Sequence, residues 1–135
     1  MIITSQEFHV TTNEPRCLVF NFGEIRRGDC TITNGVFRFY ENGATLWECT
    51  IFSADSGDEW WSSFSGGELG YDGNPETLDK FLFAVAFPYH FDIRDANTPK
   101  FWRQELTPQY IEYKTGIGPW ETFNRLRSIA VTCNC

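Results

Sequence analysis

A histidine and a carboxylate two positions apart form the most chemically suggestive short run of the chain, Tyr89-His90-Phe91-Asp92. Alternate residues of an extended strand share a face, so the imidazole of His90 and the carboxylate of Asp92 are expected side by side. Such a carboxylate orients the imidazole ring and raises its pKa, which suits a general base. We therefore predict His90 and Asp92 as catalytic residues, with a local hydrogen bond of no catalytic role as the alternative.

Asp55, Asp58 and Glu59 place three carboxylates within five residues. Hard cations such as Ca²⁺ take several oxygen ligands. The spacing differs from that of an EF-hand, and Asp and Gly are common turn residues, so a solvated turn is the preferred interpretation. No metal site is predicted, because a catalytic zinc site needs three protein ligands and His9 is the only histidine besides His90.

Aromatic side chains are the second unusual feature, since 13 Phe, 5 Trp and 5 Tyr occur among 135 residues. Each buries about 150–250 Å² on folding, more in total than a domain of this size readily hides. We expect some of them to line a pocket or an interface, with a core built of large residues as the alternative. The expected pocket residues are Phe37, Phe39, Trp47, Trp60, Trp61, Tyr89 and Trp102, with Arg38 beside them.

These features lead to one functional hypothesis. An aromatic-lined pocket would bind a mostly apolar or aromatic small molecule, and a buried carboxylate would move a proton together with His90. The candidate carboxylates are Glu48, Asp58 and Asp92. The reaction class would be cofactor-independent cyclisation or isomerisation, because aromatic faces stabilise developing positive charge. The alternative is a non-catalytic β-sandwich that binds a glycan or a protein, including a second copy of itself, through exposed Trp.

Motifs for cofactor chemistry are missing from the sequence. It contains no phosphate-binding loop, no G-x-G-x-x-G and no G-x-S-x-G, and Cys133-x-Cys135 lacks the spacing of a redox motif. No cofactor is therefore predicted.

Charge and cysteine content bear on partners and location. Eleven Lys and Arg against eighteen Asp and Glu give a net charge of −7, which disfavours nucleic acid and anionic membrane surfaces as partners. No run approaches the ~20 apolar residues of a membrane span, and the first ten residues do not resemble a signal peptide. With five cysteines, an odd number, the sequence predicts a cytoplasmic protein with reduced thiols.

Turn signals divide the chain into short strands. Two Asn-Gly pairs, Asn34-Gly35 and Asn42-Gly43, lie between runs of β-branched and aromatic residues, which is typical of tight β-hairpins. For the second hairpin two registers stay open. A two-residue turn would pair Phe39 with Leu46, whereas a three-residue turn shifts the pairing by one and gathers the apolar residues on one face.

The chain is predicted to be one all-β domain, residues 1–135, forming an antiparallel β-sandwich or small β-barrel of about nine strands. The expected strands cover residues 1–12, 16–22, 30–33, 36–41, 44–53, 59–64, 81–87 continuing over 89–93, 101–106, 109–114 and 128–132. A turn is expected over residues 23–29, a long loop over 65–80, and one helical turn over 120–125 after Pro119.

Several of these segments resemble a family of small proteins known only as a domain of unknown function. The resemblance rests on F-N-F-G-E-I-R at residues 20–26, G-D-C-T at residues 28–31 and N-G-A-T at residues 42–45 with Trp47. It continues with Asp55, Asp58, Glu59 and Trp60, then His90-Phe91-Asp92 and Val131-Thr132-Cys133. It spans residues 17–133 and implies one β domain without an assigned activity. The loop at residues 65–80 and Cys135 depart from the family pattern.

Overall fold

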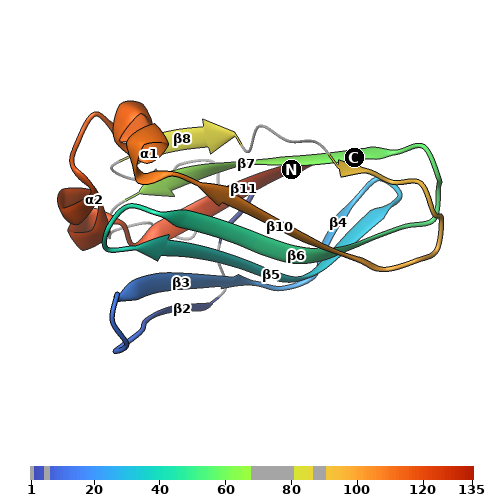
Figure 1. Ribbon diagram of the computed structural model, residues 1–135. Helices are drawn as coiled ribbons and strands as arrows, with labels where there is room; N and C mark the ends of the chain where they lie inside the picture. Colours follow the sequence, from blue (N-terminus) through green and yellow to red (C-terminus); the bar gives the residue numbers. More distant parts are fainter. Residues whose placement is uncertain (1, 5–6, 68–80, 87–90) are drawn as a thin grey trace.

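The computed structural model describes residues 2–4, 7–67, 81–86 and 91–135, most of which form strands (Figure 1). The strands are β1 (Ile2–Thr4), β2 (Glu7–Val10), β3 (Cys17–Phe22), β4 (Ile25–Arg27), β5 (Cys30–Tyr40), β6 (Thr45–Ser53), β7 (Glu59–Gly67), β8 (Phe81–Ala86), β9 (Phe91–Asp92), β10 (Lys100–Leu106) and β11 (Ser128–Asn134). The helices are α1 (Pro108–Thr115) and α2 (Pro119–Arg125).

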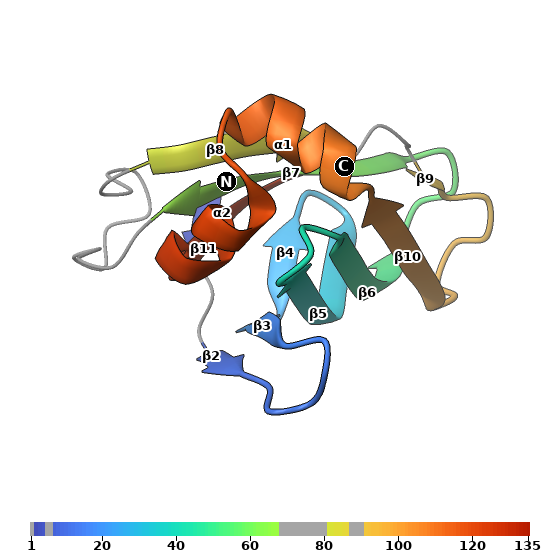
Figure 2. The ribbon, with the colours of Figure 1, turned by 60° about the vertical axis from the view of Figure 1, so that its left-hand side comes forward.

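The strands form two open antiparallel sheets. The five-stranded sheet has the order β1-β11-β7-β8, with β9 beside β7, and the six-stranded sheet has the order β10-β6-β5-β3-β2, with β4 beside β5. Figure 1 shows the sheets as two layers with both helices at one end, and Figure 2 turns that end toward the viewer. The predicted all-β fold is confirmed, and the open sandwich rather than the closed barrel is the architecture found.

Side chains from every second residue of the central strands fill the space between the sheets. Phe37 and Trp47 point inward from the six-stranded sheet, and Phe64 points inward from the five-stranded sheet. The ring centroid of Phe64 lies 4.8 Å from that of Phe37 and 4.8 Å from that of Trp47. Full burial of a large apolar side chain contributes about 1.5–3 kcal/mol, so this aromatic cluster joins the two layers.

The second Asn-Gly pair forms the predicted hairpin, in the three-residue register. Strands β5 and β6 pair so that Phe39 lies opposite Thr45 and Phe37 lies opposite Trp47. Gly43 closes the loop at a φ of 92°, a conformation that glycine adopts without steric cost. The apolar residues of both strands therefore face the core together, as this register requires.

The first Asn-Gly pair is not a hairpin turn, and that prediction is wrong. Asn34, at a φ of 54°, and Gly35 lie in a β-bulge within the single strand β5, where the pairing with β6 shifts between Thr33 and Val36. A Cβ on Gly35 would lie 2.8 Å from the indole of Trp47. The bulge therefore helps the core to pack, because it places Gly35, which has no side chain, against the buried indole of Trp47.

Residues 109–114, predicted as a strand, instead belong to helix α1. The side chain of Thr107 accepts a hydrogen bond from the backbone N–H of Tyr110, and Pro108 occupies the first turn. Gly116 ends the helix in the left-handed conformation. The predicted helical turn at residues 120–125 is confirmed as α2.

Two further predictions differ from the structure in the first third of the chain. The segment predicted as one N-terminal edge strand contributes β1 to the five-stranded sheet and β2 to the six-stranded sheet. The turn predicted over residues 23–29 contains strand β4, which pairs with the start of β5.

Candidate functional site

Four of the predicted pocket residues lie in the hydrophobic core. Phe37, Phe39, Trp47 and Trp60 are each 0% exposed, so no water-sized molecule touches their rings. None of the three hollows described below includes them in its lining, so their role as pocket walls stays a prediction. A core built of large residues, the alternative, accounts for part of the aromatic content, whereas Phe101, Tyr113 and Trp120 are exposed.

The core also holds polar atoms that lack a partner among the described residues. Gln104 on β10 lies opposite Trp47 on β6, and neither its amide group nor the Trp47 indole nitrogen has a hydrogen bond there. Each unsatisfied buried group costs about 1–3 kcal/mol.

The other predicted pocket residues lie at separate places. Trp61 pairs with Asn134 on the outer face of the five-stranded sheet, while Trp102 packs against the edge of the core, and both are partly buried. Tyr89 lies outside the described residues. The structure thus does not bring Trp61 and Trp102 together.

The predicted catalytic pair is only partly described. His90 lies outside the described residues, so its contact with Asp92 stays a prediction. Asp92 is exposed on β9, opposite Glu59 on β7. It lines an open hollow of about 350 Å³ together with Arg94 and Lys100. Asp92 is therefore not the buried carboxylate that the hypothesis requires.

Glu48 is not buried either, because the three-residue register of the hairpin places it on the outer face of the six-stranded sheet. Its Oε1 lies 3.2 Å from Nη1 of Arg38 on β5 and 3.7 Å from Nε of Arg103 on β10. Nη2 of Arg103 lies 2.7 Å from Oε1 of Glu105. These four side chains form a ladder of alternating charge across β5, β6 and β10, here named the outer charge ladder.

A hollow of about 330 Å³ opens beside the outer charge ladder, between the β5–β6 hairpin and the start of α1. Its lining includes Tyr40, Leu46, Leu106, Pro108, Arg103 and Glu105. Tyr40 also borders a second hollow of about 270 Å³, whose lining includes Pro15, Cys17 and Arg38. Aliphatic groups and one phenol ring therefore adjoin an ion pair at a concave surface.

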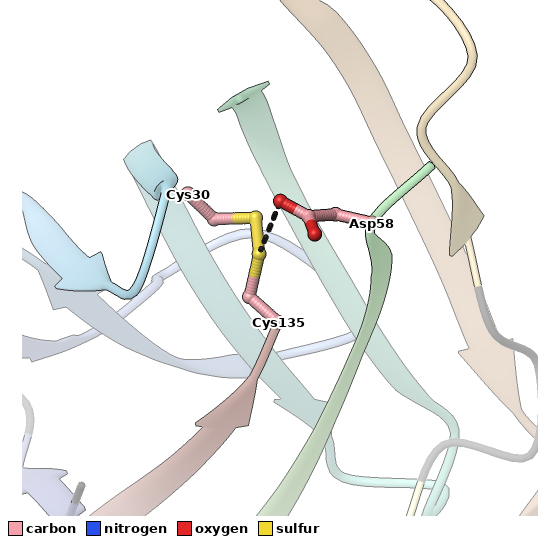
Figure 3. Close-up of side chains that lie close together, drawn as sticks. All are labelled: Cys30, Asp58 and Cys135. Carbon is pink, nitrogen blue, oxygen red and sulfur yellow. Dashed lines mark hydrogen bonds between the residues drawn. A yellow bond between two sulfur atoms is a disulfide. The ribbon is translucent and has the colours of Figure 1, made fainter. Parts of the chain in front are cut away.

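The carboxylate of Asp58 lies beside a disulfide bond, at the end of the sandwich away from the helices (Figure 3). Cys30 opens β5 and Cys135 follows β11, and their bond links the two sheets across a Cα–Cα distance of 6.2 Å. The Asp58 carboxylate accepts a hydrogen bond from the Ser53 hydroxyl (3.0 Å) and lies 3.7 Å from Cys135 Sγ. The prediction of five reduced thiols is therefore wrong for Cys30 and Cys135.

The predicted acidic turn adopts a well-bonded loop between β6 and β7. The backbone N–H of Asp55 donates to the Ser53 hydroxyl (3.1 Å), and the N–H of Gly57 donates to the carbonyl of Ile93 (2.8 Å). Carboxylate oxygens of Asp55 and Asp58 lie within 4.8 Å of each other and of Asp29, whereas Glu59 is not part of this group. The solvated-turn interpretation accounts for the loop itself.

The sequence did not predict the residues that line the hollow beside α1 or the two cysteines that form the disulfide. Tyr40, Arg103 and Glu105 are unremarkable in the sequence, although the alternation of residues 101–106 places Arg103 and Glu105 on one face. Cys30 and Cys135 are 105 positions apart, and no local signal joins them.

Comparisons with known proteins add no functional assignment. No family model matches the chain, and no curated protein matches it. Among solved structures, a Salmonella enterica trimeric lipoprotein, SadB, aligns with 98% of this chain at 8% sequence identity and a TM-score of 0.32. This chain spans 60% of the length of that one. A likeness this weak supports neither a fold family nor a function.

In the part of the chain that the structure describes, neither helix has the length and apolar character needed to cross a bilayer.

Proposed function

We propose that this protein is a non-catalytic binding module that holds a small molecule in the hollow between the β5–β6 hairpin and α1. The observation that carries the proposal is the joint presence of the Tyr40 ring, aliphatic walls and the Arg103–Glu105 ion pair around about 330 Å³. Small-molecule sites have volumes of about 300–1,000 Å³, with mostly apolar walls and a few placed polar groups.

The lining favours a ligand with one flat apolar face and a hydrogen-bonding edge. An aromatic ring such as that of Tyr40 packs against an apolar face, while its hydroxyl keeps a polar contact. The guanidinium of Arg103 and the carboxylate of Glu105 supply planar donors and acceptors for neighbouring hydroxyl groups. A neutral sugar combines these properties, so it is the ligand class that we propose.

Titration of the isotope-labelled protein with neutral mono- and disaccharides tests the proposal. We expect saturable shifts of backbone amide resonances around Tyr40 and Arg103. Tyr40→Ala and Arg103→Ala should each weaken binding at least about 10-fold, or 1.4 kcal/mol. Tyr113→Ala is the matched control, because Tyr113 lies on α1 with 80% of its surface exposed. Equal affinity in Tyr40→Ala and the unaltered protein, or shifts centred elsewhere, would contradict the proposal.

The cyclase or isomerase hypothesis stays a separate prediction. Glu48 pairs with two arginines and Asp58 accepts a hydrogen bond from Ser53, so neither is the buried, unpaired carboxylate that the hypothesis describes. The hypothesis therefore depends on His90. If it holds, His90→Ala and Asp92→Asn will abolish turnover of a candidate substrate without unfolding the protein, as circular dichroism would show.

A further inference from the structure

Among the described residues, the strongest chemical cluster outside the proposed binding hollow is formed by Cys30, Cys135 and Asp58. One ligand atom of each residue lies within 4.8 Å of the other two (Figure 3). The three groups come from three different segments: Cys30 from the six-stranded sheet, Cys135 from the segment after β11, and Asp58 from the loop before β7. Cys30 is 1% exposed, whereas Cys135 and Asp58 are partly exposed.

The spacing of sulfur and oxygen fits a tetrahedral metal ion. With Zn–S of about 2.3 Å and Zn–O of about 2.1 Å, the S···O edge of a tetrahedron is about 3.6 Å. The observed distance from Cys135 Sγ to Asp58 Oδ2 is 3.7 Å. The hydroxyl of Ser53 donates to the same carboxylate oxygen and so orients the carboxylate.

Two thiolates and a carboxylate select a particular class of cation. Thiolate ligands favour Zn²⁺ over Mg²⁺ and Ca²⁺, which prefer oxygen alone. Asp29 and Asp55 bring two more carboxylates within 4.8 Å of that of Asp58, and their negative charge attracts a dication. Either of them, or a water molecule, would supply the fourth ligand that a tetrahedral site needs.

The disulfide and the metal site exclude each other. Bonded sulfurs lie about 2 Å apart, whereas two thiolates on one Zn²⁺ lie about 3.8 Å apart. Cys135 follows the last residue of β11 and is outside the strand ladder, so its sulfur can move by this difference without breaking sheet pairing.

We propose that, in the reduced protein, Cys30, Cys135 and Asp58 form a zinc site that replaces the disulfide. A dithiol reductant gives two electrons and two protons to the disulfide, becomes a cyclic disulfide itself and leaves two protein thiols. Zn²⁺ then binds both sulfurs as thiolates, and the two thiol protons pass to solvent. In a compartment where thiols are kept reduced, the metal-binding state would be the prevailing one.

The test compares zinc binding by the oxidised and the reduced full chain. Each form is incubated with Zn²⁺, freed of loose metal on a desalting column and analysed for bound metal by mass spectrometry. We expect one zinc ion per reduced chain and none per oxidised chain. Co²⁺ in place of Zn²⁺ should give thiolate-to-cobalt absorption bands, and Ca²⁺ or Mg²⁺ should not compete.

Variants separate this site from adventitious binding. Asp58→Asn keeps both cysteines and should weaken zinc binding at least about 10-fold. Cys17→Ser removes a thiol on another part of the fold and should bind like the unaltered protein. Carboxymethylation of Cys135 in the folded, reduced protein should abolish zinc binding without any sequence change. Equal zinc binding by oxidised and reduced protein, or unchanged binding after Asp58→Asn, would overturn the proposal and leave an adventitious ion only.

Discussion

The three free cysteines show how burial controls chemistry at single residues. Cys17, Cys49 and Cys133 are buried thiols outside the disulfide. Burial raises the pKa of Cys17 to about 11, although nearby Arg38 lowers it in part, and burial raises the pKa of Cys133 to about 12. The pKa of Cys49 is also raised, by burial and by the neighbouring Cys133. The reactive thiolate form is therefore scarce in the native protein.

We predict that the native protein reacts slowly with Ellman's reagent at pH 8. A pKa raised from 9.0 to about 11 lowers the thiolate fraction of Cys17 about 100-fold, since each unit is a factor of ten. Because the pKa of Cys17 in the folded state lies above its ordinary value, the folded protein holds this thiol proton more tightly than the unfolded chain does. The free energy of unfolding therefore keeps its full value below pH 9 and falls as the pH rises toward 11. After unfolding in urea, three thiols per oxidised chain should react with the reagent. Fast reaction of all three before unfolding would contradict the prediction.

Gly35 offers a second prediction about one residue. Gly35→Ala should lower the free energy of unfolding by about 1–3 kcal/mol, because the added Cβ would lie 2.8 Å from the Trp47 indole in a packed core. Gly118→Ala is the control, since a Cβ there meets nothing within 4 Å. Urea denaturation followed by tryptophan fluorescence measures both variants. Equal stability of the two variants would rule out this account of the bulge.

Which residues of a strand share a face could be predicted from the sequence, but whether that face forms the core or lines a pocket could not. Alternation correctly indicated that Phe37 and Phe39 share one face, and the three-residue register, one of the two left open, adds Trp47 to it. It carries no information about what packs against that face, and the opposite sheet supplies Phe64 there. The same side chains are therefore indistinguishable from pocket walls until the second layer is placed.

At the scale of elements, helix α1 depends on its first turn. Thr107→Ala should destabilise the protein by about 1 kcal/mol, within a range of about 0.5–2, because the side chain no longer accepts from the N–H of Tyr110. Thr107→Ser keeps the acceptor and serves as the control. Thermal and urea unfolding give the comparison, and the prediction fails if Thr107→Ala and Thr107→Ser are equally stable.

Two elements explain where local sequence reasoning failed. In residues 109–114, alternation of large and polar side chains resembled a strand, while the decisive capping residues, Thr107 and Pro108, lie just before that segment. Asn34 has a positive φ, as Asn does in a hairpin turn, but a bulge can require the same conformation. Only the neighbouring strand β6, which continues past this point, distinguishes them.

At the scale of the whole molecule, the disulfide closes a loop that contains most of the chain. Cys30 and Cys135 are 105 positions apart, and closing a loop of about 100 residues lowers the entropy of the unfolded chain by an amount worth up to about 4.7 kcal/mol. We predict that reduction in the presence of EDTA lowers the free energy of unfolding by about 2–5 kcal/mol. The Cys30→Ala, Cys135→Ala double variant should match the reduced protein. Unchanged stability of both would show that the bond is not a structural one.

The long-range organisation could not be predicted from the sequence. The antiparallel pairing of neighbouring strands follows from local patterns, and the all-β fold was predicted correctly, whereas the strand number was not, since about nine were predicted and the described residues form eleven. Which strands meet across the sandwich depends on tertiary contacts, so the cluster of Cys30, Ser53, Asp58 and Cys135 and the hollow at Tyr40 emerge only when both sheets are assembled.

The N-terminal segment occupies one edge of each sheet, with β1 beside β11 and β2 beside β3. A truncated chain lacking residues 1–10 would present two bare strand backbones, each with hydrogen-bonding groups directed outward. The new edges, β11 of seven residues and β3 of six, would be longer than β1 of three and β2 of four, and a longer edge offers more groups for pairing with a neighbouring molecule.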